Sequence, residues 1–139
     1  MTRAEFNAFC ATLPAATHVV QWGGSDVWKI GGKMFAVAGR GDHPTPITFK
    51  VGTLAFEMLR DQPGLRPAPY LASRGLSWIQ QHASPGLADA DLRDYLRHSW
   101  ALIAQGLTKK QRAELGLVES SERAMTVGGA PVTPSRVPR

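Results

Sequence analysis

The chain has few of the residues and motifs that usually reveal a function. It contains one cysteine, Cys10, in 139 residues, which excludes an internal disulfide and a metal site built from several cysteines. No apolar run approaches the length of about 18 residues that spans a membrane, and the first residues lack the apolar core of a signal peptide. We therefore expect a reduced, cytoplasmic protein that does not enter a membrane.

Enzyme signatures are also missing. The sequence has no G-x-x-x-x-G-K-[ST] loop, no G-x-G-x-x-G, no G-x-S-x-G and no H-E-x-x-H. No two of the four histidines have the three- to five-residue spacing of a local metal pair. We expect no enzyme, no bound metal and no cofactor. An enzyme with Asp42, His43 or Tyr70 as acid–base groups is the weakest alternative, since it needs two such groups on one ligand atom.

The composition predicts one folded domain followed by a tail. Hydrophobic residues make up 43% of the chain and charged residues 19%, as in globular proteins. Residues 117–139 contain ten Gly, Pro, Ser or Thr and no aromatic residue, so they cannot bury enough apolar surface to offset their ordering entropy. We expect a single domain over residues 1–116 and a flexible tail over 117–139.

Positive charge is in excess and is concentrated in one part of the chain. The sequence has 16 Lys and Arg against 11 Asp and Glu, a formal net charge of +5. Between residues 27 and 88 there are seven cations and three acids. Trp22, Trp28, Tyr70 and Trp78 fall in the same half of the chain. Converging cations beside aromatic rings are typical of nucleic-acid binding, whereas lysines on the wet side of a sheet with tryptophans in its core are the ordinary alternative.

The clearest local pattern is a β-hairpin over residues 26–38. Two apolar runs flank Gly31-Gly32, a pair that suits a two-residue turn with positive φ. The predicted register pairs Ile30 with Lys33, Lys29 with Met34, and Trp28 with Phe35. One face of the hairpin then carries Trp28, Ile30, Phe35 and Val37, with Lys33 at its tip, and the other carries Val27, Lys29, Met34 and Ala36.

Helix signals bracket the remaining segments. Thr2 and Glu5 form a capping-box pattern before a helix predicted over Arg3–Leu13, and Thr108 with Gln111 repeats it for a short basic helix. Asp89 is the expected N-cap of a long helix over residues 90–107. Strands are expected at 17–22, 47–51, 65–71 and 76–80, the 65–71 segment being an edge or irregular strand, with a helix at 53–61. The order predicts an α+β fold with a central antiparallel β-sheet and α-helices on one face.

Several segments together resemble the MmcQ/YjbR family of small bacterial proteins. The matching stretches are residues 10–17 (CATLPAAT), 22–24 (WGG), 29–36 (KIGGKMFA), 48–51 (TFKV) and 66–72 (RPAPYLA), with Trp78 and with Leu92, Leu96 and Ser99 of the long helix. The likeness runs over about residues 3–113. It implies a CyaY-like fold, a DNA-binding surface of two hairpin wings and no catalytic residue. The acidic ridge through which CyaY and frataxin bind iron is missing, so iron delivery is not implied.

From these observations we expect a non-enzymatic DNA-binding protein. It would contact phosphates of double-stranded DNA through a basic sheet and hairpin surface, largely independently of sequence. The expected contact residues are Lys29, Lys33, Lys50, Arg66, Tyr70 and Arg74. A module that binds a small anionic ligand or a protein partner is the main alternative. We expect a monomer, although nothing in the sequence fixes the oligomeric state.

Overall fold

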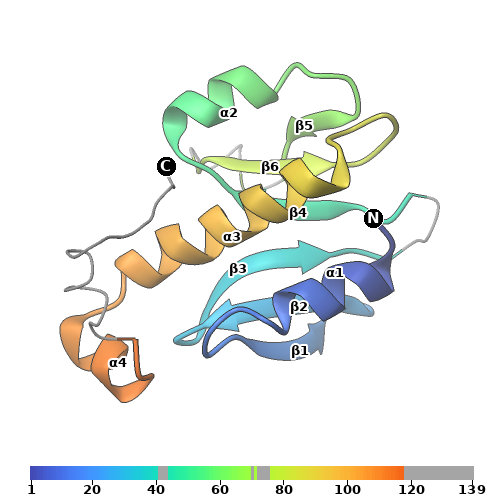
Figure 1. The fold of residues 1–139 in the computed structure, drawn as a ribbon. Coiled ribbons are helices and arrows are strands. Elements are labelled where there is room, and N and C mark those ends of the chain that lie inside the picture. Colours follow the sequence, from blue (N-terminus) through green and yellow to red (C-terminus); the bar gives the residue numbers. More distant parts are fainter. Residues whose placement is uncertain (41–43, 70, 72–75, 118–139) are drawn as a thin grey trace.

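The structure is a computed structural model that describes residues 1–40, 44–69, 71 and 76–117. In these residues a six-stranded antiparallel sheet has the order β1-β2-β3-β4-β6-β5, and four helices complete an α+β fold (Figure 1). The elements follow the chain as α1 (Arg3–Cys10), β1 (Thr17–Gln21), β2 (Ser25–Ile30), β3 (Lys33–Ala38), β4 (Ile47–Lys50), α2 (Thr53–Leu59), β5 (Leu65–Pro67), β6 (Trp78–Gln81), α3 (Asp89–Gln105) and α4 (Lys109–Glu114). The predicted α+β class is confirmed, while the predicted tail over 117–139 lies, apart from Leu117, outside the described residues.

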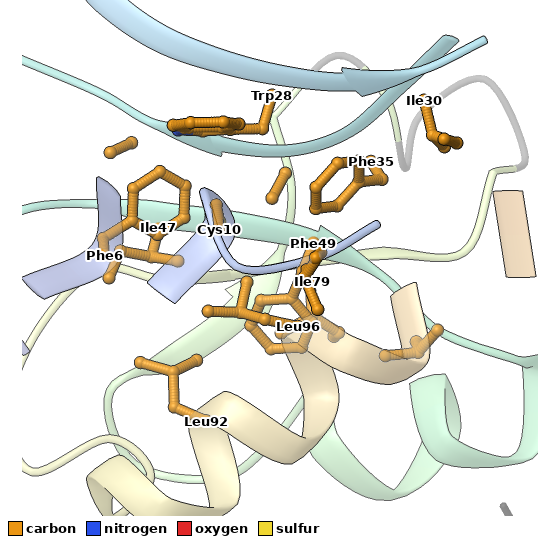
Figure 2. Packing of buried hydrophobic residues seen from close by; sticks show 14 of the residues in the cluster. Phe6, Cys10, Trp28, Ile30, Phe35, Ile47, Phe49, Ile79, Leu92 and Leu96 are labelled. Carbon is orange, nitrogen blue, oxygen red and sulfur yellow. The ribbon is translucent and has the colours of Figure 1, made fainter. Parts of the chain in front are cut away.

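The helices cover one face of the sheet. Figure 1 shows α1 and α3 lying across the same side of the strands. Phe6 and Cys10 of α1, Leu92 and Leu96 of α3, and Leu59 of α2 all join one buried cluster with the strands. Figure 2 shows this packing, in which α1 and α3 side chains meet strand residues such as Phe49 and Ile79. No helix in the described part of the chain is long and apolar enough to cross a membrane.

The helix termini confirm the capping boxes and correct two other predictions. Thr2 accepts a hydrogen bond from the Glu5 backbone and Glu5 accepts one from Thr2, and Thr108 and Gln111 do the same at α4. The first helix ends at Cys10 rather than Leu13, because the chain tightens into three-residue turns after it. Asp89 is not a cap: Ala88 holds that position, and Asp89 instead forms an ion pair of 3.0 Å with the N-terminal amine.

A β-bulge shifts the predicted hairpin register. Ile30 pairs with Lys33 and Lys29 with Met34 around Gly31-Gly32, both at positive φ, as the sequence predicts. Trp28 then faces Ala36, not Phe35, because Phe35 is the extra residue of a bulge. The alternation is broken there, so Phe35 and Ala36 both lie in the core. Beyond the bulge, each β3 side chain points to the side opposite to the one that the predicted register gives it. Val37 therefore shares a face with Val27 and not with Trp28.

Ser99 forms hydrogen bonds with two backbone groups that the bulge leaves unpaired in the sheet. The β3–β4 pairing stops at Ala36 and Phe49, so the next pair in that register, Phe35 and Lys50, does not form ladder bonds. Ser99 of α3 is fully buried, and its hydroxyl donates to the Phe35 carbonyl at 2.6 Å and accepts from the Lys50 N–H at 2.9 Å. A single helix side chain therefore closes the gap between two strands.

Candidate functional site

The face of the sheet turned away from the helices carries most of the predicted contact residues that the structure describes. We call it the outer face. Val19, Val27, Val37, Thr48, Gln80 and Arg66 lie opposite one another in one row that crosses all six strands. At about 4.8 Å per strand, this row is about 24 Å wide. Lys29, Lys50 and Trp78 lie in the neighbouring row of the same face.

The outer face brings together three of the predicted cations and excludes a fourth. Lys29 and Lys50 are half-buried, and Arg66 is exposed. Strands β2 and β4 are two strand spacings apart, about 10 Å, as are β4 and β5. Lys33 pairs with the core residue Ile30 at the hairpin tip and so belongs to the helix-covered face. The two other predicted residues, Tyr70 and Arg74, lie outside the described residues, as do Asp42 and His43.

Arg66 is held in place by a polar relay across three strands. Its Nε and Nη2 atoms both donate to Gln80 Oε1, at 2.9 and 2.7 Å. The amide of Gln80 donates in turn to Thr48 Oγ1 at 3.2 Å. These bonds fix the planar guanidinium over the sheet while leaving its Nη1 donors for another partner. None of the described residues forms an ion pair with Arg66, Lys29 or Lys50 within 4.0 Å.

Lys50 is positioned by Trp78 and Ser99. Its side chain lies over the ring of Trp78, the residue paired with it across β4 and β6, with Nζ 5.9 Å from the ring centroid. Its backbone N–H is the group fixed by Ser99. The indole of Trp78 is buried, so it supports Lys50 and has no open face for stacking on a base. Trp28 is buried too, whereas Trp22, in the turn after β1, is 63% exposed.

The one acidic residue of the described strands points to the opposite side. Asp26 accepts hydrogen bonds from Arg3 and His18, at 2.7 Å each, and from Asn7 at 3.2 Å. Burial of this carboxyl would raise its pKa, but the bonds from Arg3, His18 and Asn7 and the charge of Arg3 outweigh burial and lower the pKa to about 2. Asp26 thus stays ionised and joins α1 to β1 and β2. Among the described strand residues, the charged side chains of the outer face are therefore all positive.

Sequence reasoning predicted the outer cations but missed what orients them. Nothing in the sequence links Gln80 to Arg66, because that contact depends on β6 lying between β4 and β5. The described residues gather no group of three or more His, Cys, Asp or Glu side chains that would hold a metal ion. Cys10 is buried in the core beneath α1.

The comparisons with known proteins identify the family. A family model described as YjbR matches residues 11–102. The chain belongs to the YjbR family. This match includes all six strands and the bulge-closing Ser99. No curated protein matches the chain. Among solved structures, the YjbR chain is similar to Deinococcus radiodurans protein DR2400, whose crystal structure is described as a DUF419 domain. That likeness has 25% identity and a TM-score of 0.72, and it covers 84% of this chain and 88% of DR2400.

Proposed function

We propose that this YjbR protein binds double-stranded DNA through the outer face, as a non-enzymatic module that contacts phosphates. Lys29, Lys50 and Arg66 are the contact residues in this proposal. Duplex DNA carries one charge per about 1.7 Å of its axis, so a face about 24 Å wide meets a length with about 14 phosphate charges. A duplex can therefore engage all three cations at once.

The observation that carries this proposal is a sheet face with three cations, no acidic strand residue and no ion pair to those cations in the described residues. Surfaces of ordinary soluble domains intersperse both signs of charge. None of these three cations belongs to the buried cluster that the helices cover. An anionic partner gives a physical reason for the excess.

The same geometry favours binding that is largely independent of sequence. Base edges are read by an element that enters a groove, most often a helix in the major groove. The buried residues of α1, α2 and α3 belong to the core on the other side of the sheet. Lysine and arginine side chains that rise from strands reach phosphates, which carry no base identity.

The test is fluorescence anisotropy of a labelled duplex at several salt concentrations. Each phosphate contact adds about 0.9 to the slope of log affinity against log salt, so three contacts predict a slope of about −2.7 and an affinity loss of about 40-fold between 50 and 200 mM salt. Lys50→Glu and Arg66→Glu should each reduce the slope by about 1.

Arg97→Glu is the matched control, because it makes the same change in charge on α3, where Arg97 is exposed and lies over Phe9 on the helix side. It should leave the slope almost unchanged. No binding at low salt would contradict the proposal. If Arg97→Glu and Arg66→Glu reduced the affinity for DNA and its salt slope equally, the proposal would also be contradicted, since net charge and not the outer face would then govern binding.

A further inference from the structure

The two edges of the sheet differ in how they are protected against pairing with another strand. Edge strands expose alternate backbone N–H and C=O groups, and proteins usually block them with Pro, charged residues or very short strands. Strand β5 has all three features: it is three residues long and contains Arg66 and Pro67. Strand β1, at the other edge in the described sheet, has none of them (Figure 1).

Strand β1 has the composition of a pairing strand. Its five residues, THVVQ, contain no Pro, Gly, Lys, Arg, Asp or Glu, and two of them are β-branched valines. Four of the five are exposed, including Val19 at 37% and Val20 at 59%. Trp22, just past the strand, is 63% exposed with φ at 50°, a left-handed conformation that costs free energy for a residue other than glycine. The described edge therefore has two exposed valines and no Lys, Arg, Asp or Glu side chain.

We infer that β1 docks against β1 of a second copy of this chain, in antiparallel register about Val19. The strand is complementary to itself in that register. Val19 meets Val19 of the other copy and Thr17 meets Gln21, so an apolar group faces an apolar group at the centre and an amide faces a hydroxyl at each end, while His18 meets Val20. The absence of charged side chains removes the repulsion that self-pairing would otherwise create.

The symmetry of the pairing sets how the two outer faces lie. Two identical antiparallel strands are related by a two-fold axis perpendicular to the sheet. The two six-stranded sheets therefore join into one sheet of twelve strands, with both outer faces on the same side. Each copy contributes Lys29, Lys50 and Arg66 to one continuous surface. The dimer does not depend on the proposed function, but it would double the surface available to an extended anion.

A contact made by one five-residue strand is small compared with the interfaces of about 1,200–2,000 Å² that give stable complexes. We expect a weak dimer, with a dissociation constant of about 10⁻⁴ M. Sedimentation velocity of the full chain from about 10 µM to about 1 mM should show a mass that rises from 15.1 kDa toward twice that value.

Charge variants at the two-fold position test the register. Val19→Lys and Val19→Glu each place like charges opposite each other, so either chain alone should stay monomeric at all these concentrations. An equimolar mixture of the two should restore association, because opposite charges then face each other. Met58→Lys is the control, since Met58 is 62% exposed on α2, away from β1, and this chain should dimerise like the wild type.

A crosslink gives a measurement that does not rely on charge. Residues directly opposite in an antiparallel pair have Cβ atoms about 4.5–5.5 Å apart, close enough for a disulfide after a small adjustment. Val19→Cys should give a covalent dimer on mild oxidation, and Met58→Cys should not, while the native Cys10 is buried.

A wild-type chain that is monomeric at about 1 mM would overturn the inference. Unchanged dimerisation of both Val19 charge variants would overturn it too. Arg66→Glu, which weakens the proposed DNA binding, should leave the dimer intact, so the two proposals fail separately.

Discussion

Replacing Ser99 by alanine should destabilise the fold far more than the loss of one hydroxyl usually does. The Ser99 side chain is fully buried and serves two strands at once, through Phe35 and Lys50. In Ser99→Ala both the Phe35 carbonyl and the Lys50 N–H lose their partner. Their sheet neighbours cannot replace it, because the bulge has moved them out of register.

The magnitude follows from these two backbone groups. An unsatisfied buried donor or acceptor costs about 1–3 kcal/mol, so two of them lower the free energy of unfolding by about 3 kcal/mol. For a chain of this length the unfolding entropy is about 0.3 kcal/mol per kelvin, which converts the loss into a drop of about 10 °C in Tm. Urea unfolding should show a lower midpoint with an unchanged m-value.

Two further measurements separate this mechanism from a general loss of packing. Amide hydrogen exchange at Lys50 should accelerate in Ser99→Ala more than exchange elsewhere in β4, since that N–H loses its acceptor. Thr12→Ala removes an exposed hydroxyl bonded to the Phe9 carbonyl at 2.6 Å and should cost less than about 1 kcal/mol, because water replaces the donor. If the two alanine variants lose equal stability, the reasoning about Ser99 is refuted.

Two titratable groups give the remaining predictions. The folded-state pKa of Asp26 is about 2, below its ordinary 3.8, so the ionised carboxyl contributes about 2 kcal/mol of stability above pH 4, and this contribution is lost as the pH falls to about 2. Asp26→Asn should therefore have a lower free energy of unfolding than the wild type in urea at pH 7, and this difference should shrink at pH 2. A difference that stays constant with pH would count against the ion pair with Arg3 and the bond from His18. Burial raises the pKa of the Cys10 thiol to about 12, so a thiol reagent at pH 8 should label the native chain only as fast as it opens, and rapid labelling of folded protein would contradict this.

Local chemistry made much of the fold predictable from the sequence. The two capping boxes place the starts of α1 and α4, and Gly31-Gly32 fixes the hairpin turn and its first two pairs. These features depend on residues within a few positions of each other. The predicted cap at Asp89 failed because of a distant contact, since Asp89 pairs with the N-terminal amine.

The bulge and the strand order lay beyond sequence reasoning for the same physical reason. Phe35 can leave the ladder only because Ser99, 64 residues further on, satisfies its carbonyl. Strand β6 lies between β4 and β5, so neighbours in the sheet are not neighbours in the chain. The sequence predicts six contact residues, of which the structure places Lys29, Lys50 and Arg66 on the outer face and Lys33 on the helix-covered face. The relay that orients Arg66 needs the whole sheet.

Because successive residues of each strand point to opposite sides, the sheet separates the core that the helices cover from the outer face. Core residues such as Phe49 and Ile79 alternate with outer residues such as Lys50 and Gln80 along the same short strands. The outer positions are of two kinds, since Lys29, Lys50 and Arg66 are half-buried or exposed, whereas Val27, Val37, Thr48 and Trp78 are buried. A substitution at Lys29, Lys50 or Arg66 therefore changes mainly the surface charge, whereas a substitution at a buried outer position changes the packing as well.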